Sequence, residues 1–343
     1  MNDRIIGVSA FSGADGDRIK SAGIDTIRVD FSFPFVDRLG GTLSEAYLKE
    51  KEEAKVWVGK GLRLMGVSPL IGYGGYRADD QQHYRFHWNS LLPTYMGEPN
   101  TDELSHRYQE LCAFLAEDLR GLVSVWQIAN ELDIPMFAGP LQFYYGCELI
   151  LHGAAGLKSS DPSLIVGFNM AGAPSRLFFC GRLFANPRAA SLDYCGIDGY
   201  FGTWDAGGPE SWDERLTELY ELTHARILVN EWGFSSAGAL MSEEEKRSGV
   251  PECQLKKWRY GWGEGHTPQS QAQFVSQTWE VFHKHRQHLL GAFFYRWEDQ
   301  ESCWQCRQPD CPVETAWGLV DREGVPKPAY AAFCEGVRKF RGD

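Results

Sequence analysis

Two glutamates stand at the ends of apolar runs. Glu131 closes the stretch VSVWQIANE, where Asn130 precedes it, and Glu231 lies in ILVNEWGF. Burying a carboxylate is costly, so an apolar run that ends in one places the charge where chemistry could use it. Two carboxyl groups brought together can divide a reaction, because one transfers a proton while the other attacks an electrophilic carbon.

Cysteines form a second candidate site. The stretch ESCWQCRQPDCPVE holds Cys303, Cys306 and Cys311, and a C-x₂-C pair lets two thiolates face one metal ion. Cys253 is the nearest candidate for a fourth ligand. The hypothesis is a structural zinc, since four protein ligands leave no open position for catalysis. Free thiols, a Cys303–Cys306 disulfide, or His266 in place of Cys253 are the alternatives.

The remaining metal-binding residue types have simpler interpretations. His83 and His87 are spaced as i and i+4, and we interpret them as substrate or surface residues rather than as metal ligands. The other five cysteines fall in apolar contexts and are expected to be core thiols. These are Cys112, Cys147, Cys180, Cys195 and Cys334.

Composition limits the class of protein. The 343 residues carry a formal charge of −12 without a run of Lys and Arg, which argues against a nucleic-acid partner. No apolar stretch approaches the roughly 18 residues of a membrane span. The N-terminal residues lack the pattern of a secretory signal, and nine cysteines fit reduced thiols, so we expect a cytoplasmic protein. The oligomeric state is left open.

The chain alternates short apolar runs with amphipathic segments. Eight runs predict strands, at 4–11, 26–33, 62–71, 123–131, 164–170, 194–202, 226–234 and 290–299. Helices are expected between them, among others at 43–62, 101–121, 269–289 and 328–340. Strands that are apolar throughout and are each followed by a helix indicate a parallel sheet covered by helices. Eight such units predict a single (β/α)₈ TIM barrel over residues 1–343.

Two segments are too long to be simple connections. Residues 235–267, after the seventh strand, and residues 72–100, after the third, predict irregular loops on the C-terminal face of the barrel. In this fold the strand C-termini form the active face, so Glu131 and Glu231 are expected there, at strands four and seven. Two carboxylates in that position are the minimal equipment for hydrolysing a glycosidic bond.

This arrangement resembles the retaining glycoside hydrolases of clan A, the 4/7 superfamily, and within it families 5, 39 and 42. The resemblance rests on WQIANE, VNEWGF, the arginine of IRVDFSF and the closing WGLVDREGVPKPAY. It implies that Glu131 is the general acid and base and that Glu231 is the nucleophile. It also implies that Asn130 binds the sugar 2-hydroxyl, that Arg28 keeps Glu231 ionised, and that Tyr200 donates a hydrogen bond to Glu231.

Further substrate contacts follow from the same resemblance. Trp297 is expected to offer an aromatic face to the sugar, and Asp198 stands near the position where the family often has a histidine. Trp232 belongs to a group of tryptophans in or near the proposed active-face loops, where rings can stack on sugars. The others are Trp88, Trp204, Trp258, Trp262, Trp304 and Trp317. Asp133 is expected either to raise the pKa of Glu131 or to cap a helix.

The sequence therefore predicts a retaining β-glycosidase that acts on oligosaccharides or glycosides. A cytoplasmic location favours small, imported substrates and hence an exo-acting pocket, with the long loops after strands three, seven and eight as its walls. The chemistry requires no cofactor. An endo-acting glucanase or mannanase, a zinc-dependent barrel hydrolase and a non-catalytic carbohydrate-binding barrel are the alternatives. The sequence does not choose the sugar or the linkage.

Overall fold

Eight parallel strands close into a barrel. The computed structural model of the chain describes residues 4–78, 84–172 and 177–342. Around the barrel the strands follow the order β1-β12-β9-β8-β7-β6-β3-β2. Their bounds are Ile5–Ser9 (β1), Thr26–Asp30 (β2), Arg63–Val67 (β3), Val125–Ile128 (β6), Ile165–Phe168 (β7), Tyr194–Gly199 (β8), Ile227–Trp232 (β9) and Leu289–Phe294 (β12). Seven of these strands lie inside the predicted runs, and β12 begins one residue before its run, so the predicted TIM barrel is confirmed.

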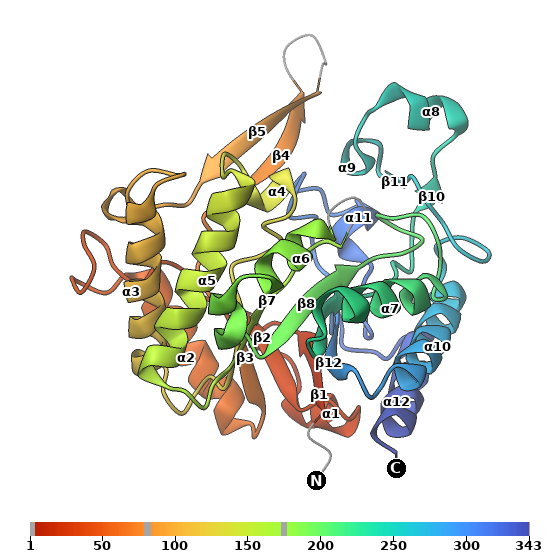
Figure 1. Cartoon of the computed structure of the whole chain (residues 1–343). Coiled ribbons are helices and arrows are strands. Elements are labelled where there is room, and N and C mark those ends of the chain that lie inside the picture. Colours follow the sequence, from red (N-terminus) through yellow and green to blue (C-terminus); the bar gives the residue numbers. More distant parts are fainter. Residues whose placement is uncertain (1–3, 79–83, 173–176, 343) are drawn as a thin grey trace.

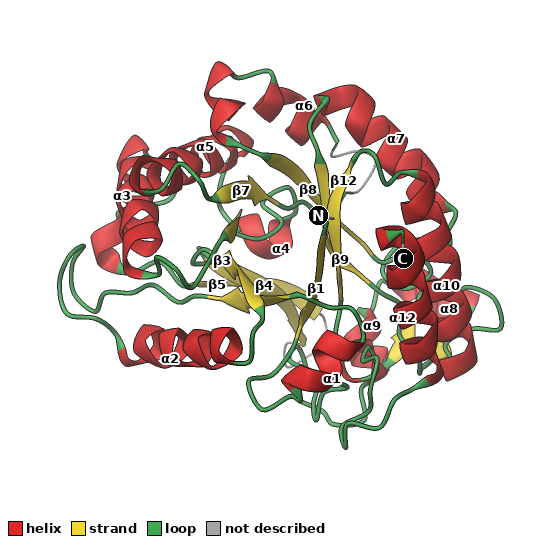
Figure 2. Ribbon diagram, turned by 90° about the horizontal axis from the view of Figure 1, so that it is seen from below, coloured by secondary structure: helices red, strands yellow, loops and turns green. Residues whose placement is uncertain are grey.

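Helices surround the barrel, as Figure 2 shows along its axis. The long ones are α2 (Glu45–Gly59), α3 (Asp102–Asp118), α5 (Phe143–Ser160), α7 (Ser211–Thr223), α10 (Pro268–Lys284) and α12 (Pro328–Arg341). Shorter ones are α1 (Gly16–Ser21), α4 (Pro135–Ala138), α6 (Phe178–Phe184), α8 (Glu243–Ser248), α9 (Glu252–Leu255) and α11 (Pro312–Thr315). None in the described part of the chain is long and apolar enough to cross a membrane.

Local sequence sets where these helices begin. Ser44, Thr101 and Thr267 precede α2, α3 and α10, and the hydroxyl of each accepts a hydrogen bond from the backbone N–H three residues on. This N-cap satisfies one of the donors that the first helical turn leaves without a partner. In α12, Pro328 occupies the first turn, where its missing N–H is not needed. The four predicted helices are therefore confirmed.

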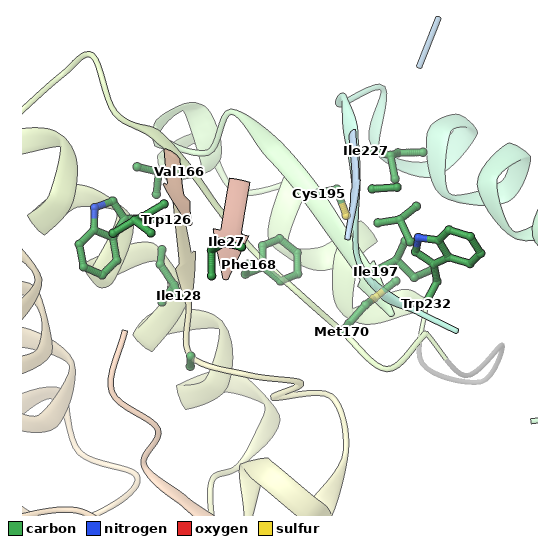
Figure 3. Close-up of a cluster of buried hydrophobic side chains, with 14 of the residues drawn as sticks. Ile27, Trp126, Ile128, Val166, Phe168, Met170, Cys195, Ile197, Ile227 and Trp232 are labelled. Atoms are coloured by element: carbon green, nitrogen blue, oxygen red, sulfur yellow. The ribbon is translucent and has the colours of Figure 1, made fainter. Parts of the chain in front are cut away.

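Two apolar layers hold the barrel together. A smaller cluster fills its interior and consists of Ile5, Met65, Val125, Tyr194, Leu228, Leu290 and Phe293. A larger one lies between strands and helices, and Figure 3 shows part of it, including Trp126, Phe168 and Trp232. Successive strand residues, such as Val125 and Trp126, enter different layers. Both faces of each strand are buried, which is why the strands appear in the sequence as continuous apolar runs.

The long loops gather at one end of the molecule. In Figure 1 the segments around β4, β5, α8 and α9 project from the end opposite to both termini. Residues 72–100 were predicted to be irregular, and this is wrong, because Gly72–Ala78 (β4) and Tyr84–Ser90 (β5) form an antiparallel hairpin. The glycines of this hairpin make room for rings: a Cβ at Gly72 would lie 2.3 Å from Trp88.

The segment 235–267 is also partly ordered. Ala239–Leu240 (β10) pairs in parallel with Lys257–Trp258 (β11), and the short helices α8 and α9 lie between them in the chain. Ser242 begins α8 with a capping box, in which its hydroxyl and the Glu245 carboxylate exchange hydrogen bonds with the backbone. The excursion is therefore a small structured unit that stands beside the barrel mouth.

Candidate active site

A cavity of about 620 Å³ opens at the C-terminal end of the barrel. Its size falls in the range of small-molecule sites. Five of the residues proposed from the sequence line it together: Arg28, Asn130, Glu131, Tyr200 and Glu231. They come from β2, β9 and the segments that follow β6 and β8, so only the closed barrel brings them to one place.

A bulge in β9 turns Glu231 into the cavity. Val229 pairs with Ile197, yet Glu231 pairs with Asp198, so Asn230 is an extra residue in this strand. Asn230 is buried and donates to Gln127 Oε1 inside the barrel at 2.8 Å. Because the bulge breaks the alternation of faces, two successive residues point inward. Without it Glu231 would face the surrounding helices.

The segment after β6 holds Glu131 in an unusual backbone conformation. Ala129 has φ of 53° and Glu131 has φ of 42°, both in the left-handed region that non-glycine residues seldom adopt. Side chains of neighbouring strands support this turn: Ser68 Oγ accepts from Ala129 N at 2.9 Å, and Asn169 Oδ1 accepts from Glu131 N at 3.0 Å. Strain of this kind is retained at functional sites when the surroundings fix it.

Arg28 is the cation of the site. Its Nη2 lies 3.0 Å from Glu231 Oε1 and 3.0 Å from Asn130 Oδ1. Burial alone would lower the pKa of Arg28, but the charges of Glu231, Asp30 and Asp198 outweigh it and raise this pKa above its ordinary value. The guanidinium therefore stays charged beside Glu231 and stabilises a carboxylate there.

Tyr200 completes the surroundings of Glu231. Its hydroxyl donates a hydrogen bond to Glu231 Oε2. Burial, followed by the charge of Glu231, raises the pKa of Tyr200 well above its ordinary value, so the phenol keeps its proton. One carboxylate oxygen of Glu231 thus faces Arg28 and the other faces Tyr200, and the two contacts fix the orientation of Glu231. The resemblance to clan A implied both neighbours.

Asn130 points a donor into the cavity. Its Oδ1 accepts from Arg28, from Gln127 Nε2 at 3.1 Å and from Asn169 Nδ2 at 2.8 Å. Arginine can only donate, so the amide atom that faces Arg28 must be the oxygen. The Nδ2 group has no hydrogen-bond partner within the described ranges and is left to donate to a bound molecule.

Glu131 differs from Glu231 in its electrostatic environment. Burial raises the pKa of Glu131 well above its ordinary value, and the charges of Glu231 and Asp133 add to this. Asp133 accepts from Ala171 N at 2.9 Å and does not cap α4, so of its two expected effects the structure supports the first. The two glutamates of the cavity therefore lie in different environments: burial and like charge favour a proton on Glu131, whereas Glu231 is paired with a cation.

Asp198 is a buried carboxyl group that hydrogen-bonds Asn169 and Glu131. It is 2% exposed, accepts from Asn169 Nδ2 at 2.5 Å and hydrogen-bonds Glu131. Burial and the charges of Glu231 and Glu131 raise the pKa of Asp198 well above its ordinary value. The expectation of a direct substrate contact is wrong, because Asp198 lies outside the cavity lining and contacts protein groups.

Two of the expected aromatic contacts are also wrong. Trp297 is 2% exposed and packs against Tyr330, with the ring centroids 6.0 Å apart. Strand β12 ends at Phe294, so the alternation of side chains between the two faces of a strand does not extend to Trp297. Tyr295 lines the cavity instead of Trp297. Trp232 follows the bulge and points outward, where it is fully buried among Trp279, Phe282, Phe294 and Phe333.

This position of Trp232 predicts a role in stability. We expect Trp232→Ala to lower the free energy of unfolding by about 3–5 kcal/mol, because it leaves a large cavity between β9 and the helices. Trp204→Ala, at a ring that lines the cavity and is partly exposed, should cost less. Urea unfolding of both variants tests this, and equal losses would contradict the assignment of Trp232 to the core.

Other site residues were not singled out from the sequence. Gln127 hydrogen-bonds Asn130, and Asn169 hydrogen-bonds the backbone of Glu131; their signal was a polar residue within a buried strand or at its end. Rings at the cavity come from four segments: Tyr73 from β4, Phe137 from α4, Trp204 from the segment after β8, and Tyr295 and Trp304 from the segment after β12. Only the two tryptophans belonged to the proposed group, whereas Trp258 and Trp317 are buried beneath the cavity wall.

The four cysteines proposed as ligands lie together. The Sγ atoms of Cys253, Cys303, Cys306 and Cys311 are all within 4.8 Å of one another. The alternative ligand His266 lies elsewhere, with both ring nitrogens at backbone oxygens, those of Ser235 and Tyr260.

The structure also bears on the alternative Cys303–Cys306 disulfide and on the pair His83 and His87. All nine cysteines fall within the described ranges and are free thiols, so the structure shows no Cys303–Cys306 disulfide. Of the second histidine pair, His83 lies outside the described residues, and His87 is exposed on β5.

Solved structures share this fold. The chain matches the GH53 catalytic domain of Ignisphaera aggregans with a TM-score of 0.66 and 17% identity, over 97% of this chain and 96% of that one. It matches a GH10 endoxylanase from a sugarcane soil metagenome with a TM-score of 0.62 and 13% identity, over 97% of both chains.

A third match is the exo-beta-1,4-mannosidase Op5Man5 from Opitutaceae bacterium strain TAV5. It has a TM-score of 0.64 and 15% identity, over 98% of this chain and 59% of that one. No family model matches the sequence, and no curated protein does. At these identities the similarity shows the fold alone.

Proposed function

We propose that this protein is a retaining β-glycosidase that cleaves β-linked oligosaccharides or glycosides by double displacement. The observation that carries the proposal is the difference between its two cavity carboxyl groups. Glu131 is held protonated by burial and like charge, whereas Glu231 is paired with Arg28 and Tyr200. Such a separation of environments assigns an acid and a nucleophile.

In the first step a Glu231 oxygen attacks the anomeric carbon. A covalent bond forms between them, and the bond from that carbon to the leaving oxygen breaks as Glu131 transfers its proton to this oxygen. Tyr200 and Arg28 hold Glu231 in position while its negative charge is lost on forming the ester. The aglycone leaves as a neutral alcohol, and the glycosyl group remains as an ester of Glu231.

In the second step Glu131 acts as a base. Esterification removes the negative charge of Glu231, which is one of the causes that raise the pKa of Glu131. That pKa therefore falls in the intermediate, and Glu131 can take a proton from water. The resulting oxygen attacks the anomeric carbon from the face that the aglycone left, the ester bond breaks, and the configuration is retained.

The cavity also suits a sugar. The Oδ1 atom of Asn130 already accepts hydrogen bonds from Arg28 and Asn169. Its Nδ2 group is therefore placed to donate to the sugar 2-hydroxyl, an interaction that strengthens in the transition state. Tyr73, Trp204 and Trp304 offer rings at which the C–H faces of sugars can stack. The names of the similar structures, which include an endoxylanase and an exo-mannosidase, support the same class of substrate.

We infer exo action from the loops that wall the cavity. The lining comes from several sides, because Tyr73 lies in β4 of the hairpin, Phe137 in α4, Glu252 in α9 and Trp304 after β12. A panel of 4-nitrophenyl β-glycosides identifies the glycone, and oligosaccharides labelled at the reducing end show the order of products. Release of single sugars from the non-reducing end supports the proposal, whereas internal cleavage indicates an endo-acting glucanase or mannanase.

The pH profile provides a further prediction. Glu131 must be protonated in the first step, so activity should fall as the pH rises through its raised pKa. Asp133→Asn removes a like charge, which lowers that pKa and should move this alkaline limb to lower pH. Asparagine keeps an acceptor for Ala171 N, so the backbone bond can persist. The dependence of kcat/KM on pH for both proteins measures the shift.

A control identifies the titrating group. In Glu131→Ala the alkaline limb should be absent on a substrate whose leaving group needs no proton. A limb that persists in that variant, or one that Asp133→Asn does not move, would assign the titration to another residue.

A further inference from the structure

The cysteine cluster has the dimensions of a metal site. With Zn–S bonds of about 2.3 Å, a regular tetrahedron separates its sulfurs by about 3.8 Å. Here Cys253 Sγ lies 3.6 Å from Cys303 Sγ, and the four sulfurs lie within 4.8 Å of one another. A disulfide would require about 2.0 Å between two sulfurs, so this spacing matches a shared ion better than a bond.

Backbone groups of the same loop point at the sulfurs. The N–H groups of Gln305 and Cys306 hydrogen-bond the sulfur of Cys303, and the N–H of Val313 does so at Cys311. Four sulfur ligands that converge in a largely buried place are the donor set of a tetrahedral metal site. The cluster has three buried cysteines and one, Cys306, that is partly exposed.

We propose that Cys253, Cys303, Cys306 and Cys311 bind one zinc ion as a structural tetrathiolate site. All four positions of the tetrahedron are then protein ligands, so the ion has no place for water or substrate and does not act on the substrate. Its chemical class follows from the donor set, since four thiolates in a tetrahedron select zinc, with iron as the main competitor.

The site would join two loops that are far apart in sequence. Cys253 lies in α9, within the excursion after β9, and the other three ligands lie between β12 and α12. Lys256 and Asp310 form an ion pair at 2.7 Å between the same two segments, but it is exposed and contributes little. A metal bond between the loops is far stronger than such a pair, so the ion would determine their relative position.

These loops carry one wall of the cavity. Glu252 is next to Cys253, Trp304 and Gln305 lie between Cys303 and Cys306, and Glu314 follows Cys311 by three residues. Cys253, Cys303 and Cys311 also belong to an apolar cluster with Trp258, Val313 and Trp317, and Tyr200, the donor to Glu231, packs against that cluster. The zinc ion therefore positions the wall that a substrate would contact, a consequence that rests on the proposed function, whereas the metal site itself does not.

Metal analysis of the purified full chain tests the site directly. We expect one zinc per chain by mass spectrometry after gel filtration, and release of that zinc when a mercurial reagent titrates the thiols. Replacement by Co²⁺ should give the visible absorption of a tetrahedral tetrathiolate. A wild-type chain that holds no metal after reconstitution with zinc under reducing conditions would overturn the proposal, and iron in place of zinc would overturn the choice of ion.

Two variants form a matched pair, because Cys306 and Cys334 are the two partly exposed cysteines. Cys306→Ser should lower zinc affinity by at least roughly 10²-fold, whereas Cys334→Ser in α12 should bind zinc as the wild type does. Equal zinc retention in both variants would contradict the assignment of Cys306. Competition with a chromophoric chelator measures the affinities without any substrate.

Limited proteolysis and kinetics test the consequence for the cavity wall. Removal of the ion should expose residues 301–311 to protease and raise KM more than it lowers kcat, because Glu131 and Glu231 belong to other segments. If no glycoside is hydrolysed by any form, the proposed function fails while the zinc measurements still decide the site. If hydrolysis persists with unchanged KM and unchanged proteolysis after zinc removal, the positioning role is refuted.

Discussion

Glu231→Ala should lose hydrolytic activity by roughly 10⁴-fold or more on every glycoside that the wild type cleaves. The substitution removes the oxygen that forms the covalent intermediate, and neither Arg28 nor Tyr200 can replace it. Rates on the best aryl glycoside measure the loss. The fold should persist, because the Glu231 side chain lies at the cavity and outside both apolar clusters.

The wild type and a second variant supply controls for this result. A 2-deoxy-2-fluoro glycoside should trap the intermediate in the wild type, and mass spectrometry should locate the label on the peptide with Glu231. Asp30→Asn changes another cavity carboxylate, 3.9 Å from Arg28, and should reduce the rate far less. A label on a different peptide, or full activity in Glu231→Ala, would refute the assignment of the nucleophile.

Glu131→Ala should show a loss that depends on the leaving group. For glycosides with a poor leaving group we expect kcat/KM to fall by about 10²–10⁴-fold, the usual contribution of general acid catalysis. For a dinitrophenyl glycoside, which needs no proton, the first step should be nearly preserved. Hydrolysis of the intermediate then becomes slow because the base is absent, so a burst of the phenol should precede a low steady rate.

Azide separates the two glutamates. In Glu131→Ala it needs no base, so it should speed turnover of the activated substrate and give the β-glycosyl azide. In Glu231→Ala it should occupy the space of the nucleophile and give the α-glycosyl azide. The anomeric form of the product, determined by nuclear magnetic resonance, assigns each residue. The same anomer from both variants would contradict the division of roles.

Much of the fold was accessible from the sequence because burial leaves a simple pattern. The barrel strands other than β2 have one face at the interior cluster and the other against helices, so they appear as apolar runs. The strands found are shorter than the runs: β6 ends at Ile128, although the run continues to Glu131. The hairpin β4–β5 was missed because its glycines resemble a loop until the rings of the partner strand are placed over them.

The two cavity glutamates were also accessible from the sequence, because a carboxyl group and an amide at the end of an apolar strand are costly to bury. Glu131, Asn130, Arg28 and Tyr200 were placed correctly at the cavity by this reasoning and by the resemblance. The supporting groups were not, since Asn169 acts through hydrogen bonds to Asn130 and to Glu131 N that cross between strands. A linear pattern does not contain such contacts.

The sequence by itself determined which residue types are present at the strand ends and that the strands are buried on both faces. The tertiary structure decided which side chains reach the cavity. The bulge at Asn230 turns Glu231 inward and Trp232 outward, and the end of β12 leaves Tyr295 rather than Trp297 at the cavity. It also brought Cys253 to Cys303 across 50 positions of the chain. The physical reason is that hydrophobicity depends on each residue, whereas register, bulges and loop contacts depend on partners that are distant in sequence.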